Sequence, residues 1–349
     1  MKKTYQYLKS TLATVLVAMT IVLPLANTRV IQAQENISVG ILQYVEHDSL
    51  DAARDGFIDG LAEAGYQEGE NLTLNYLNAG ADNANLQSMA ETLGNGNDYV
   101  FAIATPAAQS VANAISDLPV YFSAVTDPVD AGLVESLEAP GKNITGTIDA
   151  GPIKEQVDLL LSIVPEAKNI GIIYNSGETN SQGEASKATD YLESLGKEVV
   201  VGTVTSTNDI SQVMGNLVKE VDAIFTVTDN TIASAMPLVG DLAKEAGLVI
   251  VGGSKDMVVE NGLATYGLDY YELGKQTAQM LVRQIEGDLE TASIPVESAA
   301  VLELVVNEAY AEALGIDPAT IQAPVSTQDT DSSETTTEED SNQEDDSTE

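Results

Sequence analysis

Residues 37–66 read ISVGILQYVEHDSLDAARDGFIDGLAEAGY, and a matching pattern returns at residues 169–199 as NIGIIYNSGETNSQGEASKATDYLESLGKEV. Each stretch predicts a buried strand, a polar loop, an amphipathic helix and a glycine where the helix ends. Gly40 of the first strand and Gly171 of the second lie 171 − 40 = 131 positions apart. The repeat predicts two lobes of one architecture, joined in series.

A second pair of matching stretches follows in the same order. DYVFAIATPAAQSVANAI (98–115) corresponds to DAIFTVTDNTIASAMPLV (222–239), with an aspartate, an apolar strand, a threonine at the strand end and a helix in each. Strands and helices alternate throughout, which favours parallel sheets with helices on both faces. We therefore expect an α/β protein of two Rossmann-like lobes whose strand ends face a common cleft.

The expected elements follow from this alternation of patterns. In the first lobe we expect strands at about 37–43, 71–77, 99–104, 119–124 and 144–147, and helices at about 49–64, 83–93, 106–115 and 130–137. In the second lobe we expect strands at about 169–174, 197–202, 222–227, 248–252 and 263–266, and helices at about 181–195, 209–219, 230–246 and 255–260.

The domain organisation predicts a return of the chain between the lobes. The expected bounds are 37–147 and about 268–292 for the first lobe, and 148–267 for the second, with the lobe that takes the strand and short helix of 297–316 left open. Three segments would then cross, near Ile148, Leu268 and Ser293. Several crossings form a hinge, because a few backbone rotations absorb the movement of one lobe.

The N-terminus has the pattern of an export signal. Three lysines precede an apolar run from Leu12 to Ala26, and the small residue Ala33 follows. The run of about 15 residues is shorter than the roughly 20 that a membrane span needs. We expect residues 1–33 to be a signal peptide cleaved after Ala33, with an uncleaved membrane anchor as the alternative. The expected location is extracytoplasmic, either secreted or at the cell surface.

The charge balance excludes several classes of partner. The chain has 54 acidic and 15 basic residues, a formal net charge of −39. Such a chain cannot neutralise a phosphate backbone, so we expect no nucleic-acid partner, and it disfavours phosphorylated or dicarboxylic ligands. Part of the acidity lies in residues 323–349, which we expect to be a disordered tail because they have almost nothing apolar to bury.

Enzyme and metal signatures are absent from the sequence. There is no GxGxxG, GxxxxGK[ST], GxSxG or HExxH motif. There is no cysteine, which excludes disulfides, thiolate catalysis and a lipid-modified N-terminal cysteine, so the chain is not a lipoprotein. His47 is the only histidine and cannot complete a zinc site alone. We expect no enzymatic activity, no cofactor and no bound metal.

The candidate ligand-binding residues follow the strands. In open α/β sheets, ligands bind outside the carboxyl ends of the strands. The residues selected on this ground are Gln43, Tyr44, His47, Thr105, Ala107, Ala108, Thr126 and Asp127 in the first lobe, and Tyr174, Asn175, Glu178, Asn180, Ser181, Asp229 and Asn230 in the second.

Two matching turns among these loops suggest a site for a zwitterion. At Thr105-Pro106-Ala107-Ala108, a proline in the first helical turn and two small residues predict free amides that would suit a carboxylate. The alternative is a plain threonine-capped helix start. Asp229 stands at the matching turn of the second lobe, where it could accept a ligand ammonium or simply cap a helix.

Two tyrosines follow equivalent strands. Tyr44 and Tyr174 could sandwich a flat ligand, or they could be ordinary tyrosines at the rim of the cleft. The sequence alone leaves both alternatives open. His47, in the same loop as Tyr44, is expected to form hydrogen bonds within the loop rather than to act in catalysis.

Residues 37–316 resemble the ABC transporter substrate-binding proteins of the tryptophan/tyrosine type. The resemblance is carried by VGILQYVEHDSLDAARDGFIDGLAEAGY, FAIATPAAQS, VYFSAVTDPVDAGLV, NITGT, IGIIYNSGETNS, FTVTDNTIASA and YGLDYYELGKQTA. It implies a type I periplasmic-binding-protein fold, no catalytic activity, and delivery of a small ligand to a membrane permease driven by an ATPase. The loops QYVEH, ATPAA, VTDP, YNSGETNS and TDN look like those that contact ligand in the family.

The resemblance sharpens the expected function. It implies the extracytoplasmic solute-binding component of an ABC importer, with a zwitterionic ligand such as tryptophan or another aromatic amino acid held between the lobes. The alternative is a sugar or nucleoside receptor, or a ligand-modifying enzyme, on the same fold. The sequence departs from the family in lacking the lipobox cysteine and in carrying the acidic tail.

Overall fold

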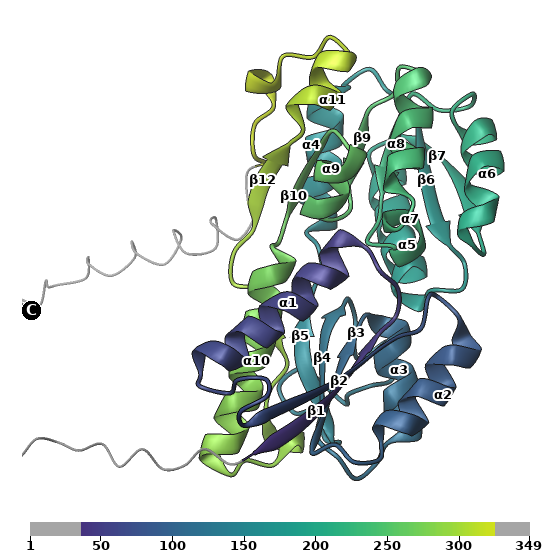
Figure 1. Ribbon diagram of the computed structural model, residues 1–349. Coiled ribbons are helices and arrows are strands. Elements are labelled where there is room, and N and C mark those ends of the chain that lie inside the picture. The colour runs from purple at the N-terminus through teal and green to yellow at the C-terminus, as the bar shows by residue number, and fades with distance from the viewer. Residues whose placement is uncertain (1–35, 325–349) are drawn as a thin grey trace, which may run out of the picture. The chain divides into compact units, whose positions relative to one another are not determined.

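Two six-stranded sheets organise the chain in a computed structural model that describes residues 36–324 (Figure 1). We call the part built on the first sheet lobe one and the part built on the second sheet lobe two. The predicted signal peptide (1–33) and nearly all of the predicted tail (323–349) lie outside the described residues.

Lobe one has the strand order β11-β5-β4-β3-β1-β2, and all of its strand pairs are parallel. Its strands are β1 (Ile37–Gln43), β2 (Leu72–Asn78), β3 (Tyr99–Ile103), β4 (Val120–Val125), β5 (Ile144–Ile148) and β11 (Glu297–Ser298). Its helices are α1 (Asp48–Glu63), α2 (Asn83–Leu93), α3 (Thr105–Ala114) and α10 (Tyr270–Gly287), with a 3₁₀ turn at Thr291–Ser293.

Lobe two repeats this arrangement with the order β12-β10-β9-β8-β6-β7. Its strands are β6 (Asn169–Asn175), β7 (Glu198–Val204), β8 (Ala223–Thr226), β9 (Ile250–Gly252), β10 (Ala264–Gly267) and β12 (Glu303–Val306), the last antiparallel to β10. Its helices are α4 (Ile153–Ile163), α5 (Thr179–Ser194), α6 (Ile210–Leu217), α7 (Asn230–Ala233), α8 (Met236–Glu245), α9 (Lys255–Asn261) and α11 (Glu308–Ala313), with 3₁₀ turns at Thr207–Asp209 and Pro318–Thr320.

The register confirms the repeat predicted from the sequence. Gly40 of β1 pairs with residues of β2 and β3, and Gly171 of β6 pairs with residues of β7 and β8 in the same way. Each lobe buries its own apolar core, and in lobe one the rings of Phe57 and Phe101 stack with centroids 3.9 Å apart. Full burial of each such side chain contributes about 1.5–3 kcal/mol. The α/β fold of two parallel-sheet lobes is therefore confirmed.

Helix α10 returns from lobe two and packs directly on α1, as Figure 1 shows. Two glycines make this close approach possible. A Cβ atom on Gly56 would lie 2.0 Å from the carbonyl oxygen of Tyr271, and one on Gly274 would lie 2.0 Å from that of Ala53. Because any side chain would collide with backbone on the facing helix, both positions require glycine.

The chain passes between the sheets three times. The crossings follow β5, β10 and β11, at residues 149–152, 268–269 and 299–302. The sequence had predicted the third crossing near Ser293, but in the structure this crossing lies several residues further along the chain. The physical reason is that Glu297 and Ser298 pair with Thr147 and Ile148 of β5, so the chain stays on the first sheet for longer.

Two helix predictions need correction, and one helix was missed. The expected helix at 130–137 does not form; turns replace it, and Gly132 has a left-handed φ of 73° that a helix does not allow. The expected helix at 230–246 divides into α7 and α8, because Pro237 has no amide proton to donate to Ala233 and its ring would clash with that carbonyl. Helix α4, at the start of lobe two, had not been predicted.

Candidate functional site

A cavity of about 250 Å³ lies between the loop after β4 and one face of α5. Its lining residues are Thr126, Asp127, Asp130 and Ala131 from lobe one, and Thr179, Asn180, Gly183, Glu184, Ser186 and Lys187 from lobe two. Drug-sized ligands occupy pockets of about 300–1,000 Å³, so this cavity suits a smaller ligand. Both lobes contribute to its wall. The loop after β4 and the helix α5 both follow parallel strands, so the cavity lies near the carboxyl ends of these strands.

Three predicted site residues line this cavity: Thr126, Asp127 and Asn180. The Thr126 hydroxyl donates to the buried carboxylate of Asp149 at 2.9 Å. Asp127 accepts the amide proton of Asp130 at 3.0 Å and lies 3.6 Å from the Lys187 ammonium across the cavity. Thr126 and Asp127 are therefore held in place by contacts within the protein.

The backbone is strained where β3 and β4 end. Ala104 has φ 81° and ψ 153°, a region that is essentially restricted to glycine, and Ala124 has φ 57°. Each costs on the order of 1–3 kcal/mol. Ala104 directly precedes Thr105, and Ala124 lies two residues before Thr126; the sequence had selected both threonines. Strain of this kind concentrates at functional sites, which supports a role for these strand ends.

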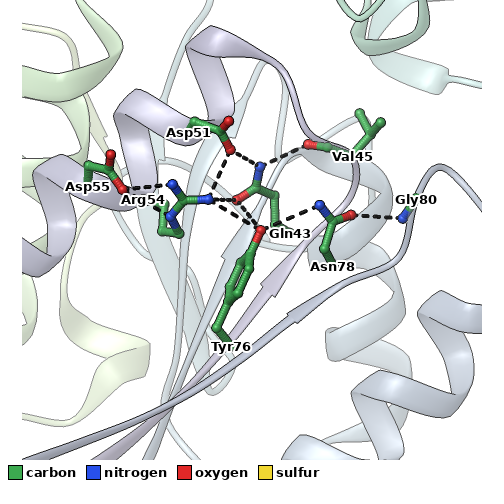
Figure 2. Close-up of polar contacts among 8 residues, drawn as sticks. All are labelled: Gln43, Val45, Asp51, Arg54, Asp55, Tyr76, Asn78 and Gly80. Atoms are coloured by element: carbon green, nitrogen blue, oxygen red, sulfur yellow. Dashed lines mark hydrogen bonds and ion pairs between the residues drawn. The ribbon is translucent and has the colours of Figure 1, made fainter.

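The side chain of Gln43 is used within lobe one, as Figure 2 shows. Its Nε2 donates to the Val45 carbonyl at 2.9 Å and to Asp51 at 2.7 Å. Its Oε1 accepts from Arg54 at 3.3 Å and from the Tyr76 hydroxyl at 3.2 Å. Since both ends of the amide already have partners, Gln43 orders the end of β1 and the first turns of α1.

Asp229 joins two strand ends in lobe two. One carboxylate oxygen caps α7 by accepting the Ile232 amide proton at 2.7 Å, and the other accepts the Asn175 amide proton at 2.6 Å. Asn175 in turn donates from its own side chain to the Thr231 hydroxyl at 2.7 Å. The helix-cap interpretation of Asp229 agrees with these contacts, because both oxygens already accept backbone protons.

Glu178 is also held inside lobe two. Its carboxylate accepts the side-chain amide of Asn230 at 2.5 Å, the hydroxyl of Thr231 at 2.9 Å, and the backbone amides of both residues. Burial and the nearby Asp229 carboxylate raise the pKa of Glu178. The contacts organise the start of α7 rather than face the cavity.

His47 contacts lobe two directly. Its Nε2 lies 3.3 Å from Oδ1 of Asn230. Because Nδ2 of Asn230 already donates to Glu178, the Asn230 oxygen must accept, and the His47 proton sits on Nε2. Burial lowers the pKa of the imidazole to about 4, so the ring is neutral at pH 7.

A second contact between the lobes joins the hydroxyls of Ser49 and Ser254 at 2.9 Å.

The anion site predicted at the start of α3 is wrong for Ala108. Helix α3 begins at Thr105, and the Ala108 amide donates to the Ala104 carbonyl at 3.0 Å. The helix thus starts one residue earlier than expected and takes up this amide. Ala107 is fully buried in the first turn.

The two candidate tyrosines differ in their surroundings. Tyr44 is buried in the core of lobe one, and its pKa is raised by burial and by the carboxylates of Glu178 and Asp229, which face it from lobe two. Tyr174 is partly buried against the core of lobe two. Stacking of both rings on a ligand stays a prediction.

Among residues 36–324, three buried side-chain oxygens have no hydrogen-bond partner: Thr105 Oγ1, Asn180 Oδ1 and Thr226 Oγ1. Buried polar atoms almost always have a partner, so such atoms call for an explanation. Asn180 lines the cavity, and its Nδ2 is fixed by a 3.0 Å bond to the Thr228 carbonyl. Ser181, its neighbour, donates to the same carbonyl at 3.4 Å. A ligand in the cavity could supply the missing partner of Asn180.

The sequence-based selection missed Glu184 and Lys187, which also line the cavity. It sampled only the loops after strands, whereas these residues stand further along α5. Helical spacing could have identified them, because residues four and seven positions after Asn180 lie on the same helix face. Glu184 is 3% exposed, and burial, reinforced by the Asp149 carboxylate, raises its pKa to about 8.

Within residues 36–324, no helix combines the length and the apolar character that crossing a membrane requires. The same part of the chain contains no cluster of three or more histidine or acidic side chains arranged to hold a metal ion.

Comparison with known proteins points to one family. A family model described as ABC transporter substrate binding protein matches residues 38–329. The chain is 38% identical over 278 residues to the Tyrosine-binding protein of Clostridioides difficile (strain R20291), and the alignment covers 79% of this chain and 80% of the relative.

Solved structures agree with this similarity. The ABC domain in complex with L-Trp from Streptococcus pneumonia matches with a TM-score of 0.79 and 37% identity, over 83% of this chain and 99% of that chain. A ligand-free, open structure of a substrate binding protein with adhesive properties from Clostridium difficile matches with a TM-score of 0.63 and 36% identity, over 80% of this chain and 95% of that chain.

Proposed function

Because the chain belongs to the ABC transporter substrate-binding protein family, we propose that it captures an aromatic amino acid between its lobes and presents it to an ABC permease. The observation that carries the proposal is the agreement of two relatives. One is named for tyrosine and the other was crystallised with L-Trp, and each aligns with about four-fifths of this chain. Tyrosine and tryptophan are therefore the proposed ligands, held as zwitterions.

The geometry of the site supports this proposal. The cavity between β4 and α5 has walls from both lobes and a buried oxygen of Asn180 without a partner. It contains three carboxyl groups, of Asp127, Asp130 and Glu184, against the one ammonium of Lys187. This balance favours a ligand with a cationic group over a phosphate or a dicarboxylate.

Closure of the lobes around the ligand is the proposed mechanism of capture. At nearly equal identity, the chain matches the L-Trp complex better than it matches the open, ligand-free relative. A hinge between lobes would produce such a difference, and three crossing segments supply one. Small-angle scattering should show a smaller radius of gyration with ligand than without it; an equal radius in both samples would contradict the hinge.

The transport role implies further partners and a location. We propose that the protein works outside the cytoplasm with a membrane permease and its ATPase, releases its ligand unchanged, and uses residues 1–33 as an export signal. N-terminal sequencing of protein released from producing cells tests the signal, and a start at Gln34 is expected.

A ligand screen tests the proposal. Tryptophan, tyrosine or phenylalanine should raise the melting temperature, because a ligand at a hundredfold excess over Kd stabilises by about 2.7 kcal/mol. Sugars and nucleosides serve as the comparison set. Mass spectrometry should recover the ligand intact after incubation. Stabilisation by sugars or nucleosides alone would overturn the ligand proposal, and conversion of the ligand would reveal an enzyme.

A further inference from the structure

Asn180 and Glu184 lie one helical turn apart on the face of α5 that lines the cavity. Both are buried, at 8% and 3% exposure. One oxygen of Glu184 accepts the Thr228 amide proton at 2.7 Å, and the Thr228 side chain also hydrogen-bonds to this carboxyl group. The buried Oδ1 of Asn180 has no partner among residues 36–324. Asn180 thus has an acceptor without a partner, and within the described part of the chain the hydrogen bonds to the Glu184 carboxyl group come from Thr228 alone.

The groups around Glu184 leave it short of positive charge. Asp127 and Asp130 line the cavity from lobe one, and the Asp149 carboxylate acts on Glu184 from the side of the crossing segments. Lys187 is the one cation in the lining; it pairs with Asp127 at 3.6 Å and lowers the pKa of Glu184 less than burial and Asp149 raise it. A buried carboxylate with so little cationic compensation is costly. The cavity as it stands favours the arrival of a positive charge.

Two other buried acids of lobe two, Asp229 and Glu178, are less suited to accept a cationic group. Asp229 accepts backbone protons on both oxygens, and Glu178 accepts hydrogen bonds from Asn230 and Thr231 on both of its own. Neither residue lines the cavity. Glu184 thus differs from them in lining the cavity and in having, among the described residues, hydrogen bonds from Thr228 alone.

We propose that the Glu184 carboxylate and Oδ1 of Asn180 together accept the α-ammonium group of the ligand. This inference rests on the proposed function, since it assigns the ammonium contacts of an amino acid in the same cavity. Glu184 is then the residue that distinguishes an amino acid from the corresponding acid without the amino group. An ammonium has three donors and can serve both acceptors at once. The raised pKa of Glu184 in the absence of a cation agrees with this assignment.

Calorimetry with matched ligands tests the assignment. The ligands are L-tyrosine and 3-(4-hydroxyphenyl)propionic acid, or L-tryptophan and 3-indolepropionic acid, each pair differing only in the amino group. The wild-type protein should bind the amino acid at least about tenfold more tightly. Glu184→Gln should weaken binding of the amino acid by about tenfold to a hundredfold, as expected for a charged hydrogen bond, and should change binding of the deaminated acid by less than about threefold.

A control and a second variant separate this effect from loss of structure. Glu193→Gln removes one exposed charge from the same helix and should leave both affinities unchanged. Asn180→Leu keeps the size but removes the acceptor together with the Nδ2 donor to the Thr228 carbonyl, and it should weaken amino-acid binding by about two- to tenfold while sparing the deaminated acid. Melting curves confirm that each variant is folded.

The outcomes distinguish this inference from the proposed function. If wild-type protein binds no aromatic amino acid, the proposed function fails and this assignment fails with it. If wild-type protein binds the amino acid and its deaminated analogue equally well, the assignment alone is overturned, even when no variant folds. Equal weakening of both ligands by Glu184→Gln would show that Glu184 supports the fold and does not contact the ammonium.

Discussion

The hydroxyl of Tyr270 donates a hydrogen bond to the carboxylate of Asp149 at 2.6 Å, and this contact joins two of the segments that cross between the lobes. Asp149 directly follows β5, and Tyr270 is the first residue of α10. The other Asp149 oxygen accepts the hydroxyl of Thr126, which lines the cavity. One buried carboxylate thus connects two of the crossing segments with the wall of the cavity.

Tyr270→Phe should destabilise the protein by about 1–3 kcal/mol, because it removes a hydrogen bond from a fully buried carboxylate. Tyr271→Phe is the matched control, since the Tyr271 hydroxyl bonds Asp59 at 2.8 Å at the surface. The control should cost much less, because this contact is open to solvent. Urea denaturation of both variants measures the difference, and equal losses would contradict a special role for the Asp149 contact.

Asp229→Asn should lower the free energy of unfolding by about 1–3 kcal/mol and leave ligand affinity within about threefold. Asparagine has one oxygen for two backbone amides, so its NH₂ group would face either the Asn175 or the Ile232 amide proton. Asp82→Asn is the control, because Asp82 accepts only the Asn85 amide at 2.9 Å and asparagine caps a helix equally well. Denaturation and calorimetry together decide: a stable variant with affinity reduced tenfold or more would restore the ammonium-site interpretation of Asp229.

Ala104→Gly should stabilise the protein by up to about 2 kcal/mol. Relief of roughly 1–3 kcal/mol of backbone strain outweighs the 0.5–1 kcal/mol or so that glycine costs through its freedom in the unfolded chain. Ala102→Gly, in β3 two residues before Ala104, has no such strain to relieve and should destabilise. Thermal denaturation compares the two variants. Similar destabilisation by both would show that the protein tolerates the Ala104 backbone without strain.

The contribution of Glu178 to the stability of the ligand-free protein should fall as the pH rises from 4.5 to about 7. Glu178 holds its proton more tightly in the folded protein than in the unfolded chain. As the pH rises, this residue ionises first in the unfolded chain, which lowers the free energy of unfolding. One such proton changes the free energy of unfolding by at most about 1.4 kcal/mol per pH unit.

Glu178→Gln should reduce the slope of the free energy of unfolding against pH, whatever its effect on stability at a single pH. Glu193→Gln removes an exposed carboxylate of lobe two and should keep the wild-type slope. Denaturation at a series of pH values measures both. Identical slopes in the wild type and Glu178→Gln would mean that Glu178 is not protonated preferentially in the folded state.

The sequence by itself determined the α/β fold and the repeated lobes. Buried strands such as Ile37–Gln43 and amphipathic helices such as Asp48–Glu63 carry their periodicity locally, and the 131-residue spacing of Gly40 and Gly171 is visible without coordinates. The same kind of local pattern also gave one wrong prediction. At 130–137 the helical pattern was present, but Gly132 adopts a left-handed conformation that ends it.

Only the tertiary structure decided which polar residues line the cavity. Gln43, Glu178 and Asp229 all follow strands, as expected of ligand contacts, yet each finds protein partners. Asp229 turns toward the amide of Asn175, which is 54 positions away in the chain and adjacent only after β6 and β8 pair. Glu184 lines the cavity because α5 turns that face toward the loop after β4. A side chain's partner depends on which donors folding brings near, and a linear pattern does not contain that information.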